Sequence, residues 1–241
     1  MTIQRVSMSQ QIRERLLDRI ACGQLQPGYR VIEAEVAAEM NVSSIPVREA
    51  IRELVAMGIL RSAPHRGAWV RQVSLLETIQ AFRVRSVLEP LAVESAAPRL
   101  QHQCQALRRV VKRIVEAARK RDFASYQHHN QLFHRAIVEA SGNEVLLRVW
   151  DSLAFEVRTR FTMDFLTTVD PVAIAREHER IVAALNRGDA AKAASLLRSH
   201  STELVNYLSA QTAHDSDGPA IPKKHSGRSH RESVKCRSAR E

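Results

Sequence analysis

Three histidines and one asparagine lie on otherwise apolar helical stripes of this sequence. Asn130 and His134 lie four positions apart, so they share one face of a helix. His178 and His200 occupy similar positions on two later stripes. A buried imidazole without a partner is unfavourable, and neutral imidazoles bind Zn, Ni, Fe or Mn. We therefore predict that these four residues hold one divalent metal ion.

A metal with three or four protein ligands keeps coordination positions open, and a nearby guanidinium would favour a small carboxylate there. Arg85 is the candidate effector-binding residue, because its helical neighbours Phe82, Leu88 and Ala92 are apolar. The alternative for Arg85 is a salt bridge to Glu89, one turn away. The alternative for any single histidine is an ordinary core residue.

The first 73 residues predict three helices followed by a hairpin, the pattern of a winged helix-turn-helix. Gly23 and the pair Pro27-Gly28 separate the first two helices, and Gly58 follows the third. Helices are expected at 9–22, 33–40 and 45–57, and strands at 59–63 and 68–73.

The third helix is expected to read DNA. Arg48 and Arg52 lie one turn apart on its outer face, and arginine is the side chain best suited to contact guanine in the major groove. Serines at the helix start can bind phosphate, and the hairpin tip can reach a minor groove. The alternative for each charged residue is a solvated surface. The candidate DNA-binding residues are Ser43, Ser44, Arg48, Arg52, His65 and Arg66.

The pattern from Ser74 to about Ala210 is helical throughout, which predicts an antiparallel all-α bundle. We expect a mainly α protein with a DNA-binding domain at 5–73 (helix-turn-helix about 33–52), a helical domain at 74–212 and a disordered basic tail at 213–241. The expected bundle helices are 75–97, 101–119, 123–141, 144–165, 171–186 and 190–208.

Composition agrees with a DNA-binding protein. The net charge of +10 and the pI of about 10.2 fit a polyanionic partner. The three cysteines are far apart, so neither a disulfide framework nor a cysteine-ligated zinc is expected. No apolar run is long enough to span a membrane and no signal-peptide core is present, so we expect a cytoplasmic protein without a membrane partner.

The N-terminal segment resembles the winged helix of GntR-type bacterial transcription regulators. The resemblance covers about residues 5–73 and is carried by Gln24-Leu-Gln-Pro-Gly28, Glu35-Val-Ala-Ala-Glu-Met-Asn-Val-Ser43, Pro46-Val-Arg-Glu-Ala-Ile51 and Gly58-Ile-Leu60. It implies operator recognition with Arg48 retained. Two base-reading positions differ, because Ser44 and Ala34 stand where the family usually carries basic residues. The family's usual half-site is therefore not carried over.

The helical half is similar to the FCD-type ligand domain of the FadR branch of these regulators. The matching motifs are Phe82-Arg-Val-Arg85-Ser-Val-Leu-Glu-Pro-Leu-Ala92, Asn130-Gln-Leu-Phe-His134, Ser141-Gly-Asn143, Glu177-His178 and His200. The resemblance implies a divalent metal held by the same four residues, and the helix count looks like the six-helix, VanR-like variety. Asn130 stands where aspartate is commoner, so weaker metal binding is expected.

Together these features predict a dimeric transcription regulator, expected to act as a repressor. It would bind a palindromic operator in double-stranded DNA and respond to a small carboxylate held at the metal. Two-fold proteins read two-fold sites, which is the reason to expect a homodimer. The alternatives are a metal-dependent enzyme and a pure metal sensor. No H-E-x-x-H motif is present, and an attached DNA-binding domain would have no role in an enzyme.

Overall fold

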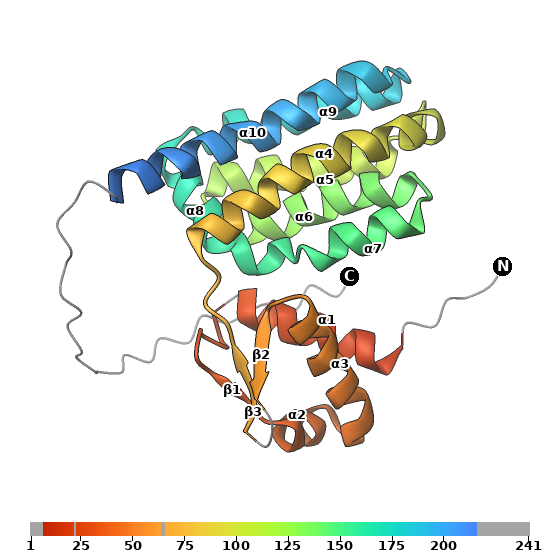
Figure 1. Cartoon of the computed structure of the whole chain (residues 1–241). Helices are drawn as coiled ribbons and strands as arrows, with labels where there is room; N and C mark the ends of the chain where they lie inside the picture. Colours follow the sequence, from red (N-terminus) through yellow and green to blue (C-terminus); the bar gives the residue numbers. More distant parts are fainter. Residues whose placement is uncertain (1–6, 22, 64–65, 216–241) are drawn as a thin grey trace.

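The computed structural model contains a small N-terminal domain and a larger helical bundle (Figure 1). It describes residues 7–21, 23–63 and 66–215. The predicted fold class, a winged helix-turn-helix followed by an all-α bundle, is confirmed. Of the predicted features, His65 and most of the basic tail lie outside the described residues.

The N-terminal domain packs three helices on a small antiparallel sheet. Strand β3 lies between β1 and β2, so the hairpin β2–β3 forms the wing. Strand β1 was not predicted, because two residues are too short to show an alternating pattern. The elements are α1 (Met8–Ala21), β1 (Arg30–Val31), α2 (Glu33–Met40), α3 (Ser44–Ala56), β2 (Leu60–Ala63) and β3 (Gly67–Val70).

Apolar side chains from all three helices form the core of this domain, and Ile12, Val47 and Leu54 are fully buried in it. The turn from α3 to β2 needs glycine at position 58, where φ is +70°. A Cβ there would lie 2.9 Å from Nη1 of Arg71. That nitrogen donates to the carbonyl of Gly58 at 2.7 Å, which fixes the end of α3 against the outgoing strand.

The carboxylate of Glu77 orders the link between the N-terminal domain and the bundle. Arg71 donates to Oε1 of Glu77 at 2.7 Å, and Glu77 and Ser74 form a capping box at the start of the next helix. The backbone hydrogen bond from Ser74 and the neighbouring Arg71 lower the pKa of Glu77. The wing and the first bundle helix are therefore joined by a short ionic clamp.

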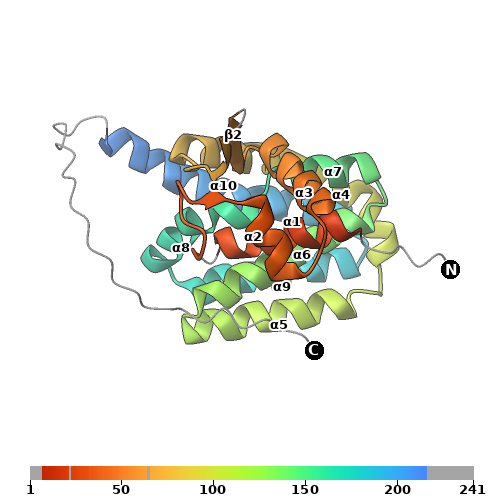
Figure 2. The ribbon, with the colours of Figure 1, turned by 90° about the horizontal axis from the view of Figure 1, so that it is seen from below.

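The bundle is built from antiparallel helices. Helix α4 lies on its outer face between α10 and α7, and α5 covers the opposite side (Figures 1 and 2). The core is apolar and continuous, with Phe133, Ile137 and Ile181 fully buried. The long helices are α4 (Leu75–Leu100), α5 (Gln105–Lys120), α6 (Phe123–Ala140), α9 (Pro171–Asn186) and α10 (Ala190–Asp215).

The prediction of a single helix at 144–165 was wrong. The chain instead forms α7 (Glu144–Ser152), the short 3-10 turn η1 (Phe155–Arg158) and α8 (Thr159–Thr168). Ala154 adopts a positive φ of 44° and ends α7, and the guanidinium of Arg158 donates to the carbonyls of Leu153 and Ala154. No glycine or proline marks this break, so the sequence carried no signal for it.

The break brings the two domains together. Ala154 is 1% exposed and packs in the core of the N-terminal domain, with Val157 beside it. Phe155, between them, points the other way and contacts Trp150 in the bundle. The turn η1 is thus shared by both cores. Among the described residues, no helix has the length and apolar character needed to cross a membrane.

Candidate functional site

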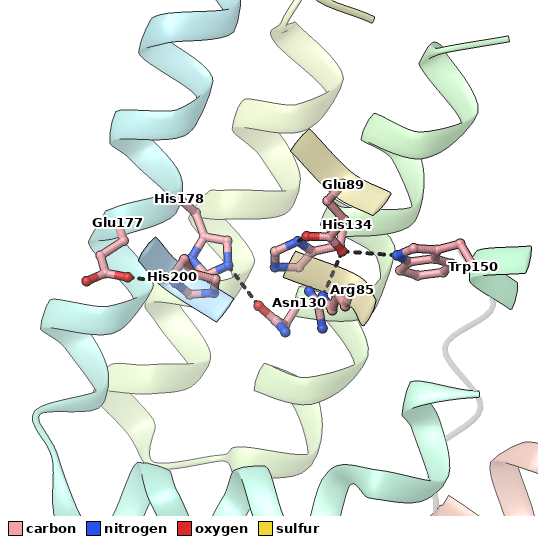
Figure 3. A network of polar contacts seen from close by, with 8 residues as sticks. All are labelled: Arg85, Glu89, Asn130, His134, Trp150, Glu177, His178 and His200. Atoms are coloured by element: carbon pink, nitrogen blue, oxygen red, sulfur yellow. Dashed lines mark hydrogen bonds and ion pairs between the residues drawn. The ribbon is translucent and has the colours of Figure 1, made fainter. Parts of the chain in front are cut away.

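The four predicted metal ligands meet inside the bundle (Figure 3). Asn130 and His134 come from α6, His178 from α9 and His200 from α10. His134 and His178 are completely buried, and the side chain of His200 is 12% exposed. One ligand atom from each histidine can be chosen so that all three lie within 4.8 Å of one another. Oδ1 of Asn130 lies 2.8 Å from Nε2 of His178.

The Nδ1 atom of each imidazole faces a hydrogen-bond acceptor. His134 Nδ1 lies 2.9 Å from Oε2 of Glu89, and His200 Nδ1 lies 2.6 Å from Oε2 of Glu177. His178 Nδ1 lies 3.0 Å from the carbonyl of Ala175. An acceptor at Nδ1 selects the tautomer with its proton there. Each Nε2 atom then carries the lone pair, which is the arrangement found behind metal-bound histidines.

The Nε2 side of the histidines suits a cation. His134 Nε2 is buried and has no partner among the described residues. With that tautomer, Nε2 of His178 and the amide oxygen of Asn130 are two acceptors that face each other at 2.8 Å, which is unfavourable. A cation beside them would remove the repulsion, and so would a flip of the Asn130 amide. Burial is the main cause that lowers the pKa of His134 to about 4, and it also lowers the pKa of His178. Both rings are therefore neutral at pH 7, as metal ligands must be.

Glu89 connects this site to the rest of the bundle. Its Oε1 accepts from Arg85 Nε at 2.7 Å and from the indole of Trp150 at 3.0 Å, while Oε2 faces His134. Burial alone would raise the pKa of Glu89, but Arg85, His134 and these hydrogen bonds hold it at about 2. The carboxylate is thus ionised and buried. Sequence reasoning considered Glu89 only as a partner of Arg85, and Trp150 carried no sequence signal.

A cavity of about 430 Å³, counted with its open mouth, adjoins the predicted metal site, and His200 is the histidine that lines it. Apolar residues of α8, α9 and α10 form much of its wall, and Arg85, Tyr126 and Asn130 supply polar groups. Ser201 also lines it, and its buried hydroxyl has no partner in the described part of the chain. A mostly apolar cavity with a few convergent polar groups is typical of a small-molecule site.

The position of Arg85 is compatible with both of its predicted roles, the salt bridge to Glu89 and the binding of an effector. Arg85 forms the salt bridge with Glu89, and it also lines the cavity. Its guanidinium lies 5.4 Å from the ring centre of Phe82 and 4.8 Å from that of Phe155. Within the described residues its two Nη groups have no hydrogen-bond partner. They remain available to an anion that enters the cavity.

The predicted DNA-binding residues gather around α3. Ser43 and Ser44 lie exposed at its start, and Arg48 and Arg52 are exposed along it. Arg48 pairs with Glu33 of α2 at 3.0 Å, with both side chains largely open to solvent. Arg66 is exposed in the wing turn. The arrangement does not test contact with DNA, so the DNA-binding roles of these residues stay predictions.

Comparison with known proteins identifies the family. Residues 8–70 match the family of bacterial regulatory proteins called gntR, and residues 80–203 match the FCD domain. The chain is 37% identical over 218 residues to the Probable D-xylose utilization operon transcriptional repressor of Paenarthrobacter nicotinovorans, covering 89% of this chain and 92% of that protein. It is 31% identical over 149 residues to the transcriptional regulator McbR of Escherichia coli, covering 61% and 67%.

The fold comparison agrees. The solved structure of E. coli McbR/YncC superposes with a TM-score of 0.72 at 25% identity, covering 86% of this chain and all of that one. A putative GntR regulator from Rhodococcus sp. RHA1 has the same fold, with a TM-score of 0.64 at 20% identity over 84% of this chain and 97% of that one. The family matches and the curated relatives indicate a transcription regulator rather than the enzyme alternative. The chain belongs to the GntR family of bacterial DNA-binding transcription regulators and carries an FCD domain.

Proposed function

We propose that this protein is a dimeric repressor that leaves a palindromic operator when a small carboxylate binds at a divalent metal in the bundle. One observation carries the proposal. Three imidazoles converge with an acceptor at every Nδ1, and the buried Nε2 of His134 has no partner among the residues that the structure describes. A buried nitrogen left in this way is unfavourable unless it has a ligand.

The donor set supports a transition metal. Three imidazole nitrogens and the amide oxygen of Asn130 suit Zn, Ni, Fe or Mn, and all four groups are neutral. When bound, the ion supplies a Lewis-acid anchor for an anionic ligand. Glu89 and Glu177 orient His134 and His200 from behind, which matches the usual support of metal-bound histidines.

The cavity supports a hydroxylated carboxylate as the effector. In the described part of the chain, the Nη groups of Arg85 and the hydroxyl of Ser201 have no hydrogen-bond partner, so they are available to a carboxylate and to a hydroxyl group of the effector. The name of one relative refers to D-xylose utilization, and acids derived from sugars combine both kinds of group. A sugar-derived acid is therefore the first class to test.

The signal has a direct route to the DNA-binding domain. A carboxylate bound to the Nη groups of Arg85 would draw the guanidinium away from Glu89, which holds its Nε, and from the rings of Phe82 and Phe155. Phe155 begins η1, whose neighbour Ala154 packs in the N-terminal core. We propose that displacement of Arg85 shifts η1 and α1, and thereby the recognition helices.

Metal content tests the proposal. Elemental analysis after reloading should find one equivalent in the wild type and much less in His178→Ala. Asn130→Asp should bind metal more tightly, because it restores a charged oxygen. His102→Asn, at an exposed position, is the matched control. A full equivalent of metal in His178→Ala would place the site elsewhere.

A DNA-binding titration separates the effector reading from the pure metal sensor. Metal alone and metal with sugar-derived acids are added in separate series to the operator complex. Release by the acid only in the presence of metal is expected. Release by metal alone would favour the metal sensor.

A further inference from the structure

The outer face of α4 carries an apolar stripe that nothing in the described chain covers. Val84, Val87 and Leu91 are 43%, 64% and 48% exposed and lie on one side of the helix. Of the eleven large apolar side chains that stand exposed in the described residues, four belong to α4. Figures 1 and 2 place this helix on the outer face of the bundle, opposite α5. Such a clustered face indicates a protein partner.

Charge at the two ends of the stripe identifies the partner. Arg83 precedes the apolar residues and Glu94 follows them, both are exposed, and neither has an ion-pair partner in the described part of the chain. A basic end, an apolar centre and an acidic end are complementary to the same sequence run in the opposite direction. Self-complementarity of this kind is what a two-fold interface requires.

We infer that α4 packs antiparallel on α4 of a second copy, around a two-fold axis at the level of Glu89. Val87 then lies against Leu91 of the second copy, and Arg83 reaches Glu94 of the second copy at both ends. The distance along the helix from Arg83 to Glu94 is about 16 Å, which matches a compact helix-helix contact. This inference rests on the dimer in the proposed function and assigns its surface.

Charge reversal tests the arrangement by sedimentation at low ionic strength, where exposed charge pairs are least screened. Arg83→Glu and Glu94→Arg should each weaken the dimer, roughly tenfold in Kd, because each change affects both ends. The double variant should return to within about threefold of the wild type, since the pairing is restored in reverse. Val87→Glu should weaken the dimer at least as much as either reversal.

Arg109→Glu on α5 is the matched control and should leave the dimer unchanged. A wild-type dimer that none of the α4 variants weakens would overturn this surface and leave the proposed function standing. A double variant as weak as the single ones would overturn the antiparallel pairing. A wild type that is monomeric while bound tightly to its operator would overturn the dimer itself.

The recognition helix carries a second, independent feature. Ile45, in the first turn of α3, is 68% exposed, more than any other large apolar side chain in the described residues. It lies on the solvent side of the helix with Ser44 and Arg48, whereas Val47 and Ile51 are buried. In a helix-turn-helix protein this end of the second helix enters the major groove. The one apolar group that bases present there is the methyl of thymine.

We infer that Ile45 contacts a thymine methyl in each half-site and so helps to select the operator. Deoxyuridine lacks only that methyl. Replacing the operator thymines one at a time should reveal one position per half-site where the wild type loses roughly threefold to tenfold in affinity. Ile45→Ala should be insensitive at that position, and Arg52→Ala should keep the sensitivity. No sensitive thymine, or equal sensitivity in Ile45→Ala, would overturn the assignment.

Discussion

At the scale of single residues, the buried histidines make the stability of the metal-free protein depend on pH. Burial lowers the pKa of His134 from 6.5 to about 4 and lowers that of His178 as well. Below pH 6.5 the unfolded chain therefore binds protons at these two histidines that the folded chain does not bind. The stabilisation is complete above the unfolded pKa and is lost as the pH falls, by up to about 1.4 kcal/mol per pH unit for each histidine.

We predict that the free energy of unfolding in chelator falls by a few kcal/mol between pH 7 and pH 5. Urea denaturation at several pH values measures it. His134→Gln removes one of the groups and should show a shallower dependence. His102→Asn, at an exposed position with a φ of 60°, should follow the wild type. Equal slopes in wild type and His134→Gln would contradict the assignment.

Arg48 forms an ion pair that competes with its predicted contact to DNA. Its pair with Glu33 has side chains that are 53% and 38% exposed, so the pair is weak and leaves the guanidinium free to turn to DNA. We predict that Arg48→Ala loses about 1–3 kcal/mol of specific binding per half-site, with folding unchanged. Fluorescence anisotropy with specific and unrelated DNA measures it, with Arg109→Ala as the control. Unchanged specific affinity would rule out base contact by Arg48.

At the scale of elements, hydrophobic periodicity and capping residues predicted a helix correctly where its bounds depend on neighbouring residues. Helix α9 was predicted with its observed bounds, because Asp170 caps it and Pro171 begins it. The convergence of Asn130, His134 and His178 also followed from helical spacing. What escaped prediction depends on contacts between distant positions. Trp150 and His134 lie 61 and 45 positions from the Glu89 that they share.

The break between α7 and α8 belongs to the same class. Alanine favours helix, so the positive φ of Ala154 arises from packing rather than from local preference. There the chain leaves the bundle core to enter the N-terminal core. A local irregularity at a domain contact is where sequence rules are expected to fail.

Phe155, which follows that break, should carry coupling without affecting metal binding. Phe155→Leu keeps an apolar side chain but removes the ring that lies 4.8 Å from the Arg85 guanidinium. We predict metal content and effector-free operator affinity close to wild type, with operator release by the carboxylate reduced severalfold. Paired titrations of operator and effector measure the coupling. Phe123→Leu, at the start of α6, is the control, because among the described residues only Phe82 and Phe155 have rings over the Arg85 guanidinium. Unchanged coupling in Phe155→Leu would remove this route.

At the scale of the whole molecule, the two domains are held by more than a linker. The clamp from Arg71 to Glu77 fixes the chain between them, and Ala154, next to η1, packs in the same core as the apolar face of α1. A bundle dimer would therefore hold two recognition helices at a defined separation. Operator spacing is then a property of the assembly, set by the surface that joins the two bundles.

Inserting five base pairs between the half-sites of the inverted repeat turns one half-site to the opposite face of the DNA, because a helical turn is about 10 base pairs. We predict that the wild type then loses most of its specific affinity, roughly a hundredfold, since one recognition helix loses its half-site. Quantitative footprinting on both operators measures it. The Val87→Glu variant, expected to be largely monomeric, is the control and should bind both operators weakly and about equally. Equal wild-type affinity for the two operators would show that the half-sites are read independently, and the rigid two-fold assembly would have to be abandoned.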